Sequence, residues 1–164
     1  MMIRLTPIKN HNIGTFALRV EVREDQQHLG NFNFAQRLGF AYADWATTGK
    51  QPFVFGIAHG EKTPVGVLII SYATAEEGEY VNGDLECYYI DVLYIDKNHQ
   101  GKGYAKEALK EAIKFIKTFP HGEAKSIYSD TKPKNEGMLK TFASVGFVET
   151  DDSNENDIVV RFAL

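Results

Sequence analysis

The apolar residues of this chain recur at two different periods, and the switching between them predicts a mixed α/β fold. Alternating or continuous apolar residues predict strands over 2–8, 53–57, 65–72, 85–95, 125–131, 147–150 and 158–163. Apolar residues three and four apart predict helices over 13–20, 34–45, 103–119 and 136–145. On the second helix, Phe34 and Trp45 are expected to face the core. The elements then follow the order β-α-α-β-β-β-α-β-α-β-β.

The connections between these elements predict how the strands pair. A short turn over 59–64 joins two predicted strands and favours an antiparallel hairpin. The strand, helix and strand over 85–131 favour one parallel pair with a right-handed crossover. We therefore expect residues 1–164 to form a single domain, with a mixed, mostly antiparallel sheet and helices on both faces.

Composition narrows the class of protein. The chain has 164 residues, 43% of them apolar, which is enough for a buried core, and its net charge of −4 argues against a nucleic-acid binder. Cys87 is the single cysteine, and the five histidines lack metal-ligand spacing, so neither a disulfide nor a metal site is expected. The longest uncharged stretch, 63–75, is too short for a membrane span, and the first residues do not resemble a signal peptide. A soluble, cytoplasmic protein is expected.

Charge is unevenly distributed along the chain. No Lys or Arg occurs over 63–96, whereas that stretch carries Glu76, Glu77, Glu79, Asp84, Glu86, Asp91 and Asp96. The following segment carries Lys97, Lys102, Lys106, Lys110, Lys114 and Lys117. Two interpretations stay open: two solvated faces of opposite sign, or an acidic rim for a cationic substrate beside a basic site for an anionic one.

The segment with the clearest chemistry is the turn between the strand over 85–95 and the helix that follows. Its residues are Gln100, Gly101, Lys102, Gly103, Tyr104 and Ala105. Glycines allow a close backbone approach and positive φ, and the N–H groups that begin a helix attract an anion. The turn is neither a Walker A loop nor a dinucleotide fingerprint, because the latter needs a third glycine where this chain has Lys106.

The pattern Gln-x-x-Gly-x-Ala at Gln100, Gly103 and Ala105 resembles the acetyl-CoA motif of GNAT-type N-acetyltransferases. A later block, Asn135 to Phe147, is similar to the family pattern Asn-x₆-Tyr-x₃-Gly-Phe, with Phe142 in place of the tyrosine. The resemblance covers most of the chain, and within the family it is nearest to bacterial spermine/spermidine acetyltransferase-like members. It implies the GNAT fold and acetyl-CoA as co-substrate.

The resemblance also implies roles for individual residues. The backbone N–H groups that would hold the pyrophosphate belong to Gly101, Lys102, Gly103, Tyr104 and Ala105, next to Gln100. The backbone of Leu93, Tyr94 and Ile95 would pair with the pantetheine arm like an added strand. Asn135 would contact the same arm or cap a helix. Phe142 would lie where the family's tyrosine serves the departing thiol, and it has no proton to give.

A protonated amine cannot attack a thioester, so a base is needed. Asp91 lies nine residues before Gln100, the spacing of a candidate base in polyamine-acetylating members of the family, and an acid is unusual within such an apolar strand. Glu86 is the second candidate, on the opposite face of the strand by parity.

These observations predict an N-acetyltransferase that moves acetyl from acetyl-CoA to a primary amine by direct attack in a ternary complex. The acidic stretch favours a cationic small molecule, a polyamine such as spermidine or spermine, as acceptor. The alternatives are a noncatalytic acyl-CoA-binding module and an acetyltransferase of protein amines. No nucleic-acid or membrane partner is expected, and a homodimer is left open.

Overall fold

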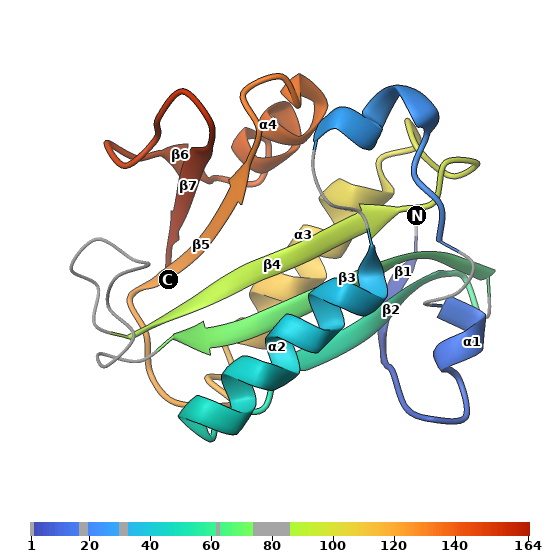
Figure 1. Cartoon of the computed structure of the whole chain (residues 1–164), viewed down its shortest axis with the longest axis horizontal. Helices are drawn as coiled ribbons and strands as arrows, with labels where there is room; N and C mark the ends of the chain where they lie inside the picture. The colour runs from blue at the N-terminus through green and yellow to red at the C-terminus, as the bar shows by residue number, and fades with distance from the viewer. Residues whose placement is uncertain (1, 17–19, 30–32, 62, 74–85) are drawn as a thin grey trace.

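The computed structural model describes residues 2–16, 20–29, 33–61, 63–73 and 86–164. Its helices and strands follow the predicted order, with one additional 3₁₀ helix (Figure 1). The strands are β1 (Ile3–Pro7), β2 (Phe53–His59), β3 (Thr63–Ala73), β4 (Cys87–Ile95), β5 (Ser126–Thr131), β6 (Val148–Glu149) and β7 (Ile158–Ala163). The helices are α1 (Ile13–Phe16), η1 (Glu24–Leu29), α2 (Phe34–Thr48), α3 (Tyr104–Ile116) and α4 (Glu136–Ala143).

The seven strands form one sheet in the order β1-β2-β3-β4-β5-β7-β6. The predicted hairpin between β2 and β3 is confirmed, as is the parallel pairing of β4 with β5 across the α3 crossover. All other neighbouring strands are antiparallel. The mixed, mostly antiparallel α/β architecture inferred from the sequence is therefore correct.

Hydrophobic clusters cover the two faces of the sheet, with α2 in front of it and α3 behind it (Figure 1). The larger cluster packs α3 and α4 against the sheet, with Leu68, Leu109 and Ile116 fully buried. The smaller cluster packs α1 and α2 against Val67 and Ile69 on the opposite face. The apolar residues of α3, which recur with the 3.6-residue period of a helix, form one face that is buried along the length of the helix, as the sequence predicts.

A β-bulge at Asp91 interrupts the alternation of β4. The register against β3 shifts between Ile69, which faces Val92, and Ile70, which faces Ile90, so Asp91 is the extra residue. As a result Ile90 belongs to the larger cluster and Val92 to the smaller one, although regular alternation would place both on one face. The bulge sets Asp91 apart from both cores.

The strands β4 and β5 pair only at their beginnings, through Tyr88 with Ile127 and Tyr89 with Tyr128. Beyond that point β5 continues to pair with β7 on its other side, so the two parallel strands separate. The hydroxyl of the buried Ser129 donates to the Ile90 carbonyl at 2.8 Å at the point of separation. The second half of β4 is thus left with an open edge on the β5 side.

Two expectations about the helices need correction. Trp45 is 40% exposed, because α2 buries only Phe34 and Ala41 against the sheet. Phe119 lies beyond the end of α3, with a φ of 51°, and is also exposed. The first predicted helix, over 13–20, is found as α1 over Ile13–Phe16, and residues 17–19 lie outside the described residues.

The close packing of β3 on β4 gives a stability prediction at Gly66. A Cβ there would lie 2.2 Å from the carbonyl oxygen of Tyr94, which is backbone and cannot rotate away. Gly66→Ala should therefore lower the free energy of unfolding by about 1–3 kcal/mol, measured by chemical denaturation. Gly39→Ala is the control, because no atom lies within 4 Å of its Cβ on α2, and it should stabilise by about 0.5–1 kcal/mol. Equal stability of the two variants would contradict the packing described here.

Candidate active site

The turn after β4 begins α3 without a side-chain cap. Gly101 and Gly103 have φ values of 72° and 77°, which glycine adopts without strain. Gly103 is the N-cap residue and makes no side-chain capping hydrogen bond. The first N–H groups of α3 therefore remain available to an anion, with the positive end of the helix dipole behind them.

A cavity of about 350 Å³ lies against this turn and the open edge of β4. It is lined by Val22, Gln26, Leu93, Tyr94, Ile95, His99, Gln100, Gly101, Gly103, Tyr104, Ala105, Lys106, Asn135, Gly137, Met138 and Thr141. We call it the cofactor pocket. All the residues expected at the cofactor line it except Lys102 and Phe142.

Two polar side chains of the turn serve the turn itself. The Gln100 amide donates to the Ile95 carbonyl at 3.0 Å and to Gln26 Oε1 at 2.8 Å, so it ties the turn to the strand and to η1. The Lys102 ammonium donates to the Asn98 carbonyl at 2.9 Å and is exposed. The backbone of the turn, rather than these side chains, is what an anion would meet in this arrangement.

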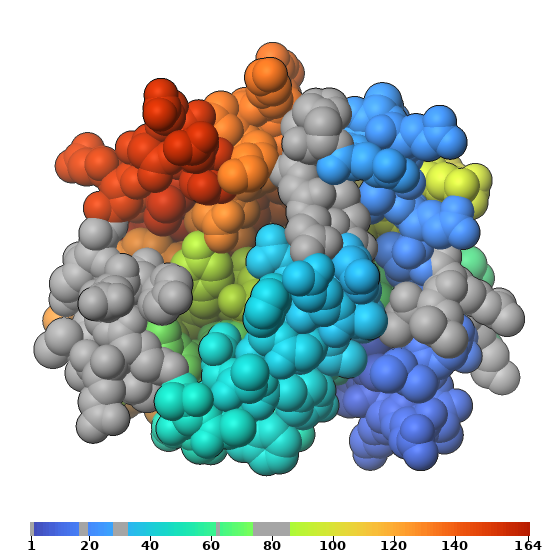
Figure 2. Space-filling view, viewed as in Figure 1, coloured from blue at the N-terminus to red at the C-terminus, as the bar shows by residue number. Residues whose placement is uncertain are grey.

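A second cavity, of about 320 Å³, adjoins the first. Four residues line both of them: Leu93, Tyr94, Asn135 and Met138. The remaining lining residues are Arg37, Ile90, Asp91, Ser129, Asp130, Thr131, Lys132, Phe142 and Asp157. Figure 2 shows the yellow-green surface of β4 at the floor of a hollow between α2 and the orange and red segments. We call this cavity the acceptor pocket.

Asp91 is the acid at the bulge, and it faces the acceptor pocket. The residue is solvent-accessible through the pocket, but the protein around it is dense enough to desolvate its carboxylate. Desolvation raises the pKa of Asp91 to about 7, against the hydrogen bond from the Ser71 hydroxyl, which lowers it. Asp44 and Asp130 add to the rise, and Arg37 opposes it. A carboxyl with this pKa exchanges protons near neutral pH.

The other charged groups of the acceptor pocket have partners. Tyr89 donates to Asp130 Oδ1 at 2.7 Å, and desolvation together with Asp130 raises the pKa of Tyr89, so its hydroxyl keeps its proton. Lys132 Nζ lies 2.9 Å from Asp157 Oδ1. Desolvation raises the pKa of Tyr94, while its hydrogen bond with Arg37 acts in the opposite direction.

The structure places the remaining predicted residues as follows. Asn135 caps α4 and also donates to Thr131 Oγ1 at 3.0 Å, on the border of the two pockets. Phe142 is buried against Phe147, and it lines the acceptor pocket but not the cofactor pocket. Glu86 is exposed just before β4, next to the Tyr72 hydroxyl, and it lines neither pocket.

Several pocket residues are not identified from the sequence. Val22 and Gln26 reach the cofactor pocket, and Arg37 reaches the acceptor pocket, from segments far away along the chain. No short-range pattern marks them, because their contacts join residues more than fifty positions apart. Ser71 can be recognised as a partner of Asp91 only after the pairing of β3 with β4 is known. The acidic residues over 76–84, expected as a rim, lie outside the described residues.

Two kinds of site are absent from the part of the chain that the structure describes. No group of three or more His, Cys, Asp or Glu side chains there could hold a metal ion. No helix among those residues is long and apolar enough to cross a membrane.

Comparisons with known proteins agree with this geometry. The acetyltransferase (GNAT) family matches residues 16–147. No curated protein sequence matches the chain. The family match carries the GNAT fold and acetyl-CoA as co-substrate, as the motif at Gln100 to Ala105 predicts.

Solved structures with the same fold differ strongly in sequence. Spermidine N-acetyltransferase from Vibrio cholerae in complex with CoA and spermine is 15% identical, with a TM-score of 0.66 over 98% of this chain and 95% of that one. Arabidopsis thaliana NAA60 in complex with a bisubstrate analogue is 13% identical, with a TM-score of 0.65 over 99% and 98%. The NatC complex bound to Gag peptide and CoA is 18% identical, with a TM-score of 0.64 over 100% and 99%.

The uncapped start of α3 gives a prediction for cofactor binding. Gly103→Val introduces a branched side chain at a φ of 77° and blocks close approach to the N–H groups behind it. We expect CoA affinity, measured by calorimetry, to fall by about 2 kcal/mol or more, because several hydrogen bonds to charged phosphate are lost together.

Gly60→Val is the matched control. Gly60 has a φ of 64°, so the variant carries similar backbone strain, but it lies in the β2–β3 turn and lines neither pocket. It should lose stability while it keeps CoA affinity. Unchanged CoA affinity of a folded Gly103→Val protein would show that the turn is not the pyrophosphate site.

Proposed function

The chain belongs to the acetyltransferase (GNAT) family, and from this premise we propose that its acceptor is a cationic primary amine, with a polyamine such as spermidine or spermine as the leading candidate. The family assignment makes it an acetyl-CoA-dependent acyltransferase that acts on amines. The finer assignment of the acceptor rests on the chemistry of the acceptor pocket.

One observation carries the proposal: the two pockets meet at Leu93 and Tyr94, and Asp91 lies on the acceptor side of that junction. Acetyl-CoA supplies a thioester whose carbonyl carbon the amine attacks. A thioester bound along the open edge of β4 would reach the junction from the cofactor pocket. An amine in the acceptor pocket would meet it there, which fits direct attack in a ternary complex.

Asp91 would act as the base in this scheme. An ammonium group must lose a proton before its nitrogen has a lone pair for attack, and an ionised Asp91 can accept that proton. The Ser71 hydroxyl donates a hydrogen bond to one oxygen of the carboxylate, and Asp91 lines the acceptor pocket. Glu86, the alternative base, would need a chain of water molecules to act from its position before β4.

The charge of the acceptor pocket supports a cationic acceptor. Three carboxylates, Asp91, Asp130 and Asp157, face two cations, Arg37 and Lys132. Lys132 is paired with Asp157, so above pH 7, where Asp91 is mostly ionised, Asp91 and Asp130 outweigh Arg37 in the remainder of the pocket. Asp44 adds negative potential at Asp91 from α2. An acceptor with several ammonium groups would meet carboxylates at both Asp91 and Asp130.

Two other functions are kept as outcomes of the test. Acetylation of protein amines is one, because the NatC complex, which has the same fold, binds a peptide. A noncatalytic acyl-CoA-binding module is the other, because Phe142 cannot protonate a leaving thiolate. A thiol with a pKa around 8.5 leaves tolerably without an acid, so the phenylalanine is compatible with turnover.

A thiol-release assay separates these functions. The protein is mixed with acetyl-CoA and, in turn, with spermidine, spermine, aminoglycosides, amino acids and peptides, and free CoA thiol is measured. We expect release with the polyamines well above the rate without acceptor. Release with peptides alone would assign protein amines, and none with any acceptor, despite CoA binding, would assign a noncatalytic module.

The raised pKa of Asp91 predicts a specific pH profile. In the native protein kcat/KM should rise with pH as Asp91 ionises near pH 7, and then level off. In Asp91→Asn the ammonium must lose its proton to solvent, with a pKa near 10.4, so kcat/KM should keep rising toward pH 10. The deficit of the variant should be about 10²-fold at pH 7–8 and should shrink toward pH 10. A deficit that is the same at every pH would remove Asp91 from the role of base.

Ser71 provides the matched control for that profile. Its hydroxyl lowers the pKa of Asp91, so Ser71→Ala should move the rise of kcat/KM to higher pH. Ser71→Thr keeps a hydroxyl and should leave the rise close to its native position. An unmoved profile in Ser71→Ala would show that the rise belongs to another group.

A further inference from the structure

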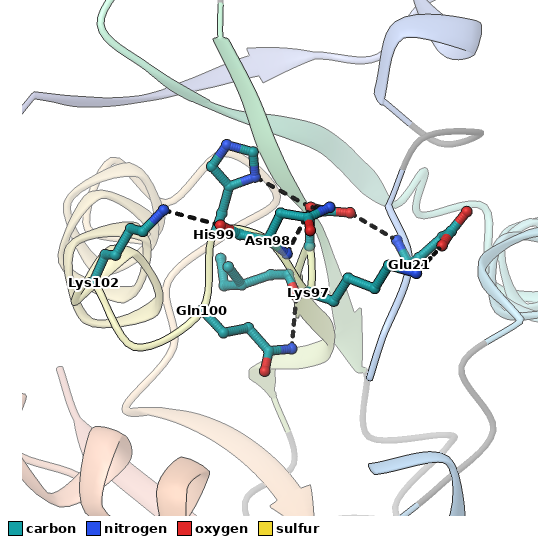
Figure 3. A network of polar contacts seen from close by, with 8 residues as sticks. Glu21, Lys97, Asn98, His99, Gln100 and Lys102 are labelled. Carbon is teal, nitrogen blue, oxygen red and sulfur yellow. Dashed lines mark hydrogen bonds and ion pairs between the residues drawn. The ribbon is translucent and has the colours of Figure 1, made fainter. Parts of the chain in front are cut away.

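A buried carboxylate, Asp96, lies between the cofactor turn and a distant part of the chain. It is 7% exposed and directly follows β4. Figure 3 shows Glu21, Asn98 and His99 converging on one carboxylate, which belongs to Asp96. Its Oδ1 accepts from the Asn98 backbone at 3.0 Å, the Asn98 amide at 3.2 Å and His99 Nδ1 at 3.2 Å.

The other oxygen of Asp96 reaches across the sequence. Oδ2 accepts the backbone N–H of Glu21 at 3.1 Å, a contact between residues 75 positions apart. Desolvation works against ionisation, but the hydrogen bonds from Glu21, Asn98 and His99 hold the pKa of Asp96 below its usual range. The carboxylate is therefore charged and buried, and it accepts hydrogen bonds from the turn and from this distant segment.

That segment, residues 20–26, is here called the strap. Besides the bond to Asp96, its Glu21 carbonyl accepts from the Lys97 backbone at 2.7 Å, and Gln26 accepts from Gln100 at 2.8 Å. An exposed ion pair between Lys97 Nζ and Glu21 Oε2, at 2.6 Å, also joins the strap to the residue after Asp96. Two residues of the strap, Val22 and Gln26, line the cofactor pocket opposite the β4 edge and the turn.

We propose that Asp96 is a positioning residue for acetyl-CoA: it holds the strap against the cofactor turn so that Val22 and Gln26 complete the wall of the cofactor pocket. Asp96 lines neither pocket, so it acts through the strap and the turn. The same carboxylate fixes Asn98 and His99, and thereby links the shape of the turn to the position of the strap. The proposal rests on the use of acetyl-CoA by this family and is independent of the identity of the amine.

Asp96→Asn tests the proposal, because it keeps the size of the side chain and replaces one accepting oxygen by a donor. An amide nitrogen facing the Glu21 N–H, or the donors of Asn98 and His99, cannot accept from them. We expect the Kd for CoA, measured by calorimetry, to rise about tenfold, as for loss of a hydrogen bond to a charged group. The KM for acetyl-CoA should rise likewise, while the KM for the amine stays within about twofold.

Hydrogen exchange provides the readout that a general loss of stability would not give. The amides of Glu21 and Lys97 should exchange faster in Asp96→Asn, while those of buried α3 residues such as Leu109 keep their protection. Asp151→Asn, an exposed substitution of the same kind between β6 and β7, controls for the change in charge and should bind CoA as the native protein does.

The outcomes separate this proposal from the function itself. Failure of the native protein to bind CoA would overturn the proposed function, whereas native-like CoA affinity in Asp96→Asn would overturn the role of Asp96 alone. If Asp96→Asn does not fold, Gln26→Ala tests the strap from its other side, because it removes the bond to Gln100 and part of the pocket wall. Native-like CoA affinity in a folded Gln26→Ala protein would then overturn the proposal.

Discussion

The separation of β4 from β5 after a two-residue parallel pairing is the constraint on which the candidate site depends. A parallel pair that continued would use up the backbone edge of β4 and close the space on which both pockets border. β5 is kept in place by its full pairing with β7, and Ser129 supplies the hydrogen bond that the Ile90 carbonyl loses where the strands part. The bulge at Asp91 falls at the same level of β4 and turns an acid toward the space so created.

The fold could be predicted from the sequence wherever short-range patterns decide it. The buried face of α3, the hairpin of β2 and β3, and the glycine turn after β4 all follow from spacing within a few residues. Trp45 was mispredicted because helical spacing identifies an apolar face without stating how wide a surface the sheet offers it, and α2 buries only two side chains. The bulge at Asp91 was also hidden, since it is defined by the partner strand.

The candidate site likewise has one part that short-range sequence patterns predict and one part that they do not. The cofactor turn is a continuous segment, so its glycines and its position between a strand and a helix could be recognised directly. The acceptor pocket gathers side chains from α2, β4, β5, α4 and the loop before β7. Of the residues that line this pocket and not the cofactor pocket, only Asp91 and Phe142 are predicted from the sequence. The strap was invisible for the same reason, since its contacts to Asp96 and Gln100 span more than seventy positions.

The environment of Asp91 also has a consequence for the stability of the fold. Its pKa is about 7 in the folded chain and near 3.8 in an unfolded one, so between these pH values the folded state holds more protons on this group than the unfolded state does. Stability falls with rising pH wherever the folded state holds more protons, so the contribution of Asp91 is fully present below pH 4 and is lost as pH rises through 7. The ionised form that can accept a proton from an amine is thus the form that the fold tolerates least. If Asp91 is the base, as proposed, the reactive form is retained at a cost in stability, and selection for stability alone would remove this acid.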